Sequence, residues 1–259
     1  MVRLLIAYDG TFFRGWARQP GRPVRTVEGV LTDRLEDVLG QRITMSVAGR
    51  TDAGVHAAGQ VASFLTSSGL ATTRIQAAVN ATLSPEVVVR EAIDAAPWFD
   101  ARFSASARIY RYVIDTAPVA DPFTGRFVWH RPGPLSLEPM RAAVRPLIGE
   151  HDFASFCRHP GSGKSTVRRL ERVAVRREHD VVSLVFRANA FLHQMVRSLV
   201  GTLVAAADGR IEPESTGTIL AARSRSAAKY LAPPAGLVLE RVVYGGRAMS
   251  GPGSSVPND

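Results

Sequence analysis

The sequence has one cysteine, Cys157, and no long hydrophobic run among its 259 residues. A single cysteine excludes an internal disulfide, so we expect a reducing compartment, the cytoplasm. No run approaches the ~18 apolar residues that a membrane-spanning helix needs. The apolar start, Arg3–Asp9, ends in an acid and predicts a first β-strand rather than a signal peptide. We therefore expect no membrane association.

Motifs of several enzyme classes are also missing. The sequence has no G-x-S-x-G elbow, and its six histidines form no cluster with metal-ligand spacing. The stretch "GSGKST", Gly161–Thr166, has Arg158 where a P-loop needs its first glycine, and no buried strand precedes it. We expect no metal site and no nucleoside triphosphate site, and we interpret this stretch as a flexible basic loop that contacts phosphate.

Lysine is almost absent, but positive charge is abundant. Only Lys164 and Lys229 are lysines among 32 basic residues, and the formal net charge is +9. A GC-rich genome accounts for the use of arginine but not for the excess of base over acid. Surplus positive charge favours a polyanionic partner, most often nucleic acid.

The first part of the chain predicts a split α+β unit. Thr26 can cap a helix that ends before Gly40, and apolar residues repeat between them at helical spacing. The resulting order is strand, helix, strand, strand, helix, strand, which is typical of a ferredoxin-like antiparallel sheet. The expected elements are strands at Arg3–Asp9, Arg42–Ala48, Gln60–Leu65 and Glu86–Ile93, and helices at Thr26–Leu39 and Thr73–Leu83.

The second part predicts another α+β unit, which gives domains at 1–104 and 105–245 and a disordered tail at 246–259. A short helical turn and the basic loop fill Gly149–Arg169. The other expected elements are strands at Arg108–Asp115, Leu170–Arg177, Val181–Ala188 and Gly236–Tyr244, and helices near Leu137–Ile148, Phe191–Gly209 and Glu212–Ala222.

The stretch "VAGRTDAGVHA", Val47–Ala57, places Arg50, Asp52 and His56 among glycines and small residues. An Asx-turn is the ordinary role of an aspartate beside glycine. In extended chain, however, the Arg50 and Asp52 side chains leave on the same side, and the guanidinium would keep the carboxylate ionised and orient it. A charged carboxylate with open space beyond it can act as a base or a nucleophile.

This motif, with "YDG…GW…Q" at Tyr8–Gln19, closely resembles the tRNA pseudouridine synthase A (TruA) family. Further similar segments follow in order and cover most of residues 3–244: "FDARFSASARIYRYVI", "GEHDFASF", "ANAFLHQMVRSLVG" and "APPAGLVLERVVY". The resemblance implies an α+β fold with two ferredoxin-like, pseudouridine-synthase-type halves. Their mainly antiparallel sheets would form a continuous central sheet flanked by helices, with a basic RNA-binding cleft between the halves.

The resemblance also implies a reaction and its residues. Uridines 38 to 40 in the anticodon arm of tRNA would become pseudouridine without a cofactor or metal. Asp52 matches the essential aspartate, as nucleophile or base, and Tyr110 matches the tyrosine that stacks on the flipped base. Arg197, a charge in an apolar helix that needs a partner, matches the arginine that pairs with the aspartate. Arg50 would hold the base out of the RNA.

The implied partners are tRNA and a second copy of the chain in a homodimer. Each basic candidate could instead be an ordinary solvated residue. Two other functions remain open: a non-catalytic RNA-binding protein on the same scaffold, or a specialised paralogue that acts on another RNA or serves a C-nucleoside pathway. The expected substrate contacts, besides Tyr110, are Arg14, Arg18, Arg158, Lys164, Arg168, Phe191 and Leu192, with Arg22 and Arg25 on the same arm as the first two.

Overall fold

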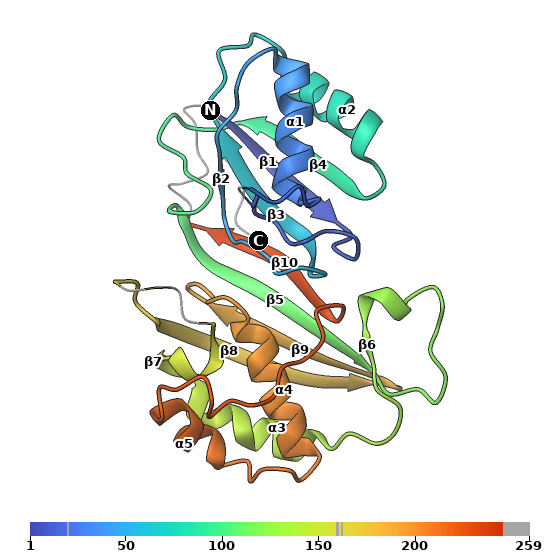
Figure 1. Ribbon diagram of the computed structural model, residues 1–259, viewed down its shortest axis with the longest axis vertical. Coiled ribbons are helices and arrows are strands. Elements are labelled where there is room, and N and C mark those ends of the chain that lie inside the picture. The colour runs from blue at the N-terminus through green and yellow to red at the C-terminus, as the bar shows by residue number, and fades with distance from the viewer. Residues whose placement is uncertain (20, 159–160, 162, 246–259) are drawn as a thin grey trace. The chain divides into compact units, whose positions relative to one another are not determined.

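The computed structural model describes residues 1–19, 21–158, 161 and 163–245 (Figure 1). Of the described residues, the first unit holds Met1–Ala107 and 239–245, and the second unit holds Arg108–Val238. The domain ranges 1–104 and 105–245 stay a prediction. The two units differ from those ranges in that residues 239–245 belong to the first unit. The tail expected at 246–259 lies outside the described residues.

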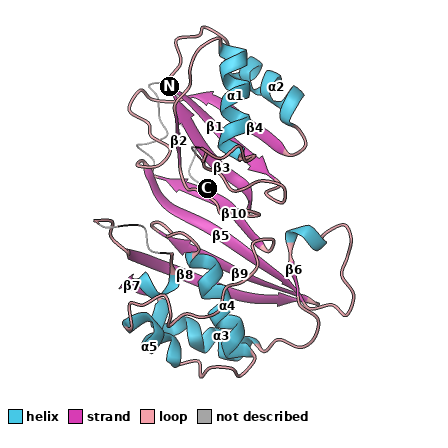
Figure 2. Ribbon diagram, viewed as in Figure 1, coloured by secondary structure: helices cyan, strands magenta, loops and turns pink. Residues whose placement is uncertain are grey.

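The first unit is an antiparallel sheet with two helices on one face (Figures 1 and 2). Its elements are β1 (Val2–Tyr8), α1 (Val27–Leu39), β2 (Met45–Val47), β3 (His56–Phe64), α2 (Thr72–Leu83), β4 (Val87–Asp94) and β10 (Leu237–Tyr244). β1 pairs with both β3 and β4, β2 pairs with β3, and β10 follows β3 in the strand order. This is the split arrangement expected from the sequence, and it confirms the α+β class for this unit.

Helix α1 forms where local signals predict it. The Thr26 hydroxyl accepts a hydrogen bond from the Gly29 N–H at 3.2 Å and so satisfies a free amide at the N-terminus. Gly40 takes a φ of +65° and ends the helix. Leu31 and Leu35 are fully buried one turn apart, so α1 packs its apolar face against the core.

The second unit also combines an antiparallel sheet with helices. Its elements are β5 (Ala105–Asp115), β6 (Trp129–His130), α3 (Leu137–Val144), β7 (Gly149–Asp152), β8 (Val167–Glu178), β9 (Val181–Ala188), α4 (Met195–Ala207) and α5 (Ser215–Ala221), with short 3-10 turns at Gly125–Phe127, Arg145–Leu147 and Ala154–Phe156. The strand order is β5-β9-β8-β7, all antiparallel, and β6 pairs in parallel with the end of β5. The sequence did not predict β6 or β7, because both are too short to show an apolar period.

Helix α4 is the centre of the second unit's core. It was expected to begin at Phe191, but it begins at Met195, because Gln194 takes a left-handed φ of +64° that interrupts a helix. Nearly every residue of α4 is buried, and a Cβ on Gly201 would lie 2.8 Å from the Tyr230 backbone. In the described ranges, none of the helices could cross a membrane by its length and apolar character.

Candidate active site

The turn at Gly49–Val55, called the Asp52 turn below, connects β2 to β3. The Val55 N–H donates to the Asp52 carbonyl oxygen at 3.2 Å, and Gly54 takes a φ of +77°, which is strained for residues with a side chain. Asp52 itself is only half-buried. The turn therefore fixes the backbone at Asp52 while the carboxylate stays within reach of a ligand.

A second loop, Gly10–Gln19, called the arm, packs against the Asp52 turn through backbone groups. The Trp16 N–H donates to the Thr51 carbonyl oxygen at 3.1 Å, and the Gly54 N–H donates to the Phe13 carbonyl oxygen at 3.3 Å. The side chains of Trp16 and Phe13 are buried, which anchors the arm itself in the core. The Asp52 turn is thus held from both sides of its aspartate.

Two glycines allow the arm and the Asp52 turn to approach so closely. A Cβ on Gly10 would lie only 2.1 Å from the Val55 carbonyl oxygen. A Cβ on Gly15 would lie 2.8 Å from the Thr51 carbonyl oxygen, and Gly15 also takes a φ of +90°. Any larger residue would push the arm and the turn apart, which explains the two glycines of the "YDG…GW" spacing.

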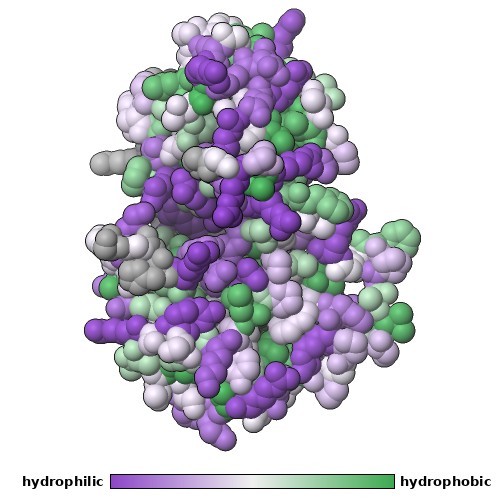
Figure 3. All heavy atoms as spheres, in the orientation of Figure 1, coloured by the Kyte–Doolittle hydropathy of each residue, from purple (hydrophilic) through white to green (hydrophobic). Residues whose placement is uncertain are grey.

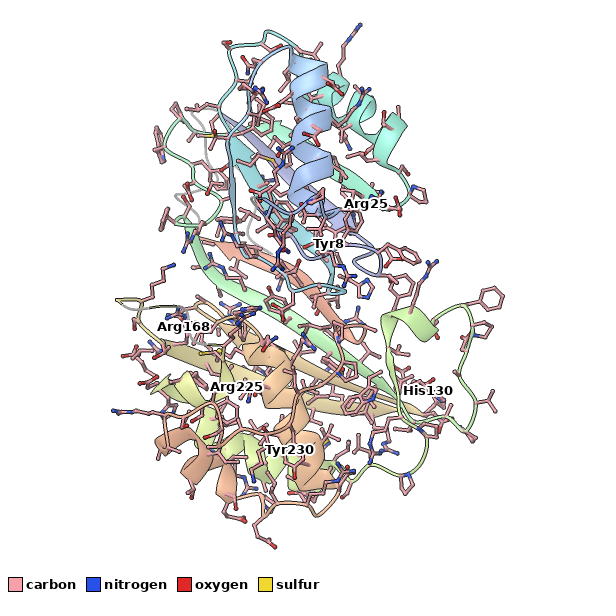
Figure 4. All side chains as sticks on the ribbon, viewed as in Figure 1. Tyr8, Arg25, His130, Arg168, Arg225 and Tyr230 are labelled. Atoms are coloured by element: carbon pink, nitrogen blue, oxygen red, sulfur yellow. The ribbon has the colours of Figure 1, made fainter. Side chains whose placement is uncertain are left out.

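Two buried polar side chains, Tyr8 and Gln60, lie beneath the Asp52 turn and contact it. The hydroxyls of Tyr8 and Thr51 are hydrogen-bonded at 2.8 Å, and the amide of Gln60 donates to the Gly49 carbonyl oxygen at 2.6 Å and to the Tyr8 hydroxyl at 3.4 Å. Burial raises the pKa of Tyr8 to about 12, although the hydrogen bonds to Thr51 and Gln60 oppose this shift. The phenol is therefore neutral at physiological pH. Figure 4 shows it on β1.

His56 does not belong to the exposed part of the motif. β3 begins at His56, four residues before the strand expected at Gln60, so the imidazole is buried. Its Nδ1 accepts a hydrogen bond from the Gly10 N–H at 3.0 Å and lies 3.2 Å from Asp9 Oδ1. His56 Nδ1 is therefore close to both the Gly10 amide and the Asp9 carboxylate, at the start of the arm. His56 supports the start of the arm.

Arg50 does not orient Asp52 as the sequence suggested. Arg50 is exposed, and among the described residues it makes no hydrogen bond or ion pair. The expected contact between Arg50 and Asp52 is wrong because β2 ends at Val47. The alternation of side chains along a strand therefore does not extend to these residues. The Arg50 guanidinium is available to a ligand.

Two arginines of the basic segment 14–25 have no charged partner among the described residues. Arg14 and Arg22 are exposed, and their side chains make no hydrogen bond or ion pair within the part of the chain that is described. A hollow of about 390 Å³ is lined by Arg18 and Arg22 and by the first turns of α1. Unpaired arginines on a surface loop are suited to phosphate contact.

The other two arginines of this segment already have partners. Arg18 forms an ion pair with Asp33 and donates to the Gly29 carbonyl oxygen at 3.1 Å. Arg25 binds Glu86 through two hydrogen bonds of 2.9 and 2.6 Å, and its guanidinium lies 4.5 Å from the centre of the Phe13 ring. Figure 4 marks Arg25 in the loop before α1. Each of these arginines is partly neutralised, and each would have to exchange its partner to bind phosphate.

In the second unit, three candidate residues gather around β5 and the segment before α4. Tyr110, on β5, is 6% exposed. Its ring meets the Phe191 ring edge-on, with centroids 5.1 Å apart and planes at 81°. Leu192 is buried next to Phe191, which is itself half-buried. The structure thus brings Tyr110 and Phe191 together as an aromatic pair.

Arg197, in the first turn of α4, contacts the segment that precedes β10. Its Nε donates to the Ala232 carbonyl oxygen at 2.8 Å, and its own carbonyl oxygen accepts from the Ala232 N–H at 3.0 Å. The nearby Tyr112 hydroxyl donates to the Pro233 carbonyl oxygen at 2.8 Å. Burial raises the pKa of Tyr112, and the Arg197 charge acts in the opposite direction. Arg197 and Asp52 belong to different units, and their pairing stays a prediction.

The basic loop before β8 divides into free and engaged side chains. Arg158 and Lys164 are exposed, and their side chains make no hydrogen bond or ion pair with another described residue. Arg168 is half-buried and donates to the Ser165 and Val167 carbonyl oxygens at 3.0 and 2.6 Å, and burial lowers its pKa. Positions 159, 160 and 162 of this loop lie outside the described residues.

Among the described residues, no group of three or more histidine, cysteine, aspartate or glutamate side chains could hold a metal ion. On the face shown in Figure 3, hydrophobic residues are scattered among hydrophilic ones over each unit.

Sequence reasoning missed the residues that support Asp52, namely Tyr8, Thr51 and Gln60. The conspicuous "YDG" and "RTD" motifs contain two of them, but nothing local shows that they meet.

The chain is similar to known proteins along most of its length. A family model described as "tRNA pseudouridine synthase" matches residues 4–104 and 143–245. The chain is 40% identical to the tRNA pseudouridine synthase A of Moorella thermoacetica, over 94% of this chain and 99% of that protein. It is 42% identical to the enzyme of the same name from Halalkalibacterium halodurans, over 93% of this chain and 91% of that protein.

A solved structure is also similar in part. It is titled "Crystal structure of the archaeal box H/ACA sRNP Nop10-Cbf5 complex", and it matches 79% of this chain and 43% of its own at 11% identity with a TM-score of 0.37.

Proposed function

The chain belongs to the tRNA pseudouridine synthase family, and we propose that it isomerises uridine to pseudouridine in tRNA. The relatives carry the name tRNA pseudouridine synthase A and match nearly the whole chain. At the finer level, we propose uridines 38 to 40 of the anticodon arm as substrates. We further propose that the cytoplasmic enzyme works as a homodimer without a cofactor or metal.

One observation carries the proposed mechanism: Asp52 is half-buried on a turn whose backbone is held by the arm. The reaction breaks the C1′–N1 bond of uridine and rejoins the base to the ribose through C5. Asp52 would attack the ribose or remove a ribose proton, and either step needs an ionised carboxylate held near the sugar.

The base must leave the RNA stack before the carboxylate can reach the sugar, at a cost of about a few kcal/mol. We propose that Arg50, which is exposed and makes no hydrogen bond or ion pair with another described residue, takes the place of the base in the RNA. Tyr110 would stack on the flipped uracil. Because Tyr110 is 6% exposed, a neighbouring side chain must move first, and we propose that Phe191 does so. Arg197 would pair with Asp52, and Leu192 would line the pocket.

For the RNA backbone, we propose contacts to Arg14, Arg158 and Lys164, whose charges are not neutralised by described partners. Arg18 and Arg168 were expected to bind substrate as well. They remain weaker candidates, because the first is paired with Asp33 and the second is turned back onto its own backbone.

The experiment is release of tritium from tRNA labelled at C5 of uridine, measured for the wild type and for Asp52→Asn. We expect the wild type to release tritium and Asp52→Asn to lose activity while it still binds tRNA. Turnover by Asp52→Asn would refute the role of Asp52. Absence of activity in the wild type on tRNA, with activity on another RNA, would favour the specialised paralogue. Binding without turnover on any RNA would favour the non-catalytic alternative.

A further inference from the structure

The Asp52 turn is attached to the core by polar side chains that belong to other elements. Tyr8 lies on β1 and Gln60 lies on β3, and the paired strands bring both beneath the turn. The Tyr8 hydroxyl meets the Thr51 hydroxyl at 2.8 Å, directly before Asp52, and Gln60 meets the Gly49 carbonyl oxygen at 2.6 Å. Two points of the turn are therefore fixed to the sheet on the N-terminal side of Asp52.

The side chains that make these contacts are buried. Tyr8 is 5% exposed, Thr51 is 7% exposed and Gln60 is fully buried. Water cannot readily replace a partner in such a place, so loss of one hydroxyl leaves its partner unsatisfied. The Tyr8 ring also packs against Trp16, the residue whose N–H holds the Thr51 carbonyl oxygen. The contacts to Thr51 from β1 and from the arm are thus coupled.

We propose that Tyr8, Thr51 and Gln60, called the clamp below, are positioning residues for Asp52. This inference rests on the proposed function, because it concerns the same turn. The clamp does not touch the substrate. It sets the height and direction of the Asp52 backbone relative to the sheet, so its loss changes the rate of the chemical step rather than the affinity for tRNA. Misplacement of a reacting group by about 1 Å can cost about 100-fold in rate.

The test compares Tyr8→Phe with Tyr244→Phe in the tritium-release assay. Tyr244 is the matched control, because its hydroxyl also donates to a backbone carbonyl in the first unit, that of Ala101 at 2.8 Å, away from the Asp52 turn. We expect Tyr8→Phe to lower kcat by about 10- to 100-fold with an unchanged KM for tRNA. Tyr244→Phe should keep the wild-type kcat.

Thr51 gives an independent measure of the same contact. Thr51→Val should lower kcat as Tyr8→Phe does, the two together should cost no more than one alone, and Thr51→Ser should restore most of the rate. A folded Tyr8→Phe with wild-type kcat would overturn the proposal, and so would a loss that appears only in KM. If Tyr8→Phe does not fold, the comparison of Thr51→Val with Thr51→Ser decides the proposal.

The result can be separated from failure of the proposed function. If the wild type is active and Asp52→Asn is not, the proposed function stands, and the Tyr8 and Thr51 variants then test only the clamp. If the wild type releases no tritium, the function fails, and amide hydrogen exchange at the Asp52 turn judges the clamp. Faster exchange there in Tyr8→Phe than in Tyr244→Phe supports it, and equal exchange refutes it.

Discussion

Substitution of Gly15 tests whether the arm sets the position of the Asp52 turn. An alanine Cβ at Gly15 would lie 2.8 Å from the Thr51 carbonyl oxygen, and ordinary van der Waals contact begins at 3.4 Å. The arm and the turn must therefore separate by about 0.6 Å, which strains the hydrogen bond from the Trp16 N–H to the Thr51 carbonyl oxygen. The φ of +90° adds backbone strain of about 1–2 kcal/mol.

Gly40→Ala provides the matched control. Gly40 also has a positive φ, +65°, but a Cβ there would meet no atom within 4 Å. Gly40→Ala should therefore cost about 1–2 kcal/mol of stability through backbone strain alone. Gly15→Ala should cost about 1–3 kcal/mol more, because it also crowds a packed interface. Urea unfolding of the two variants measures this difference.

The activity of the two variants decides the argument. A shift of about 0.6 Å at the residue before Asp52 should lower kcat for tritium release by about 10-fold. Gly40→Ala should keep the wild-type kcat at temperatures where it is folded. If folded Gly15→Ala has the same kcat as Gly40→Ala, the arm moves and the turn does not. The inferred link between the arm and Asp52 is then wrong.

Three further predictions concern charge and protonation. Burial raises the Tyr8 pKa to about 12, against about 10 in the unfolded chain, so its contribution to stability is complete below about pH 10 and is lost as the pH rises towards 12. The urea midpoint of the wild type should thus fall more steeply between about pH 10 and 12 than that of Tyr8→Phe. Arg14→Gln should weaken tRNA binding and lower the slope of log Kd against log salt concentration by about one unit. Arg25→Gln should change this slope less, because Glu86 already neutralises Arg25. Equal slopes for the two variants would contradict this prediction. Cys157 is buried and its pKa is raised by burial, so the thiolate is scarce and a thiol reagent at pH 8 should label it only after unfolding.

The sequence predicted what depends on local signals. Thr26 and Gly40 define both ends of α1 because the capping hydrogen bond and the left-handed φ involve only near neighbours. The split order of the first unit followed from apolar periods of the same local kind. The motif around Asp52 could be found because it places an acid among small residues, which predicts a base or a nucleophile, although the specific reaction came from a resemblance.

What the sequence could not predict depends on contacts between distant residues. Tyr8 and Thr51 are 43 positions apart, and only the pairing of β1 with β3 brings them together. Gly10 meets Val55 for the same reason. The expected contact between Arg50 and Asp52 failed because strand alternation was applied to residues beyond the end of β2. Neither charge nor spacing indicates where a short strand stops.

The separation between the anchors of the Asp52 turn and its carboxylate allows chemistry and position to be tested apart. The hydrogen bonds that hold the turn to the arm and the clamp fall on Gly49, Thr51 and Gly54, so Asp52→Asn leaves them in place. Gly15→Ala and Tyr8→Phe do the reverse: they disturb the anchors and keep the carboxylate. A protein that only binds RNA has no reason to lose function in both classes of variant while its tRNA affinity is unchanged. A carboxylate that must attack the ribose or remove a ribose proton does lose activity in both, because its rate depends on both its charge and its position.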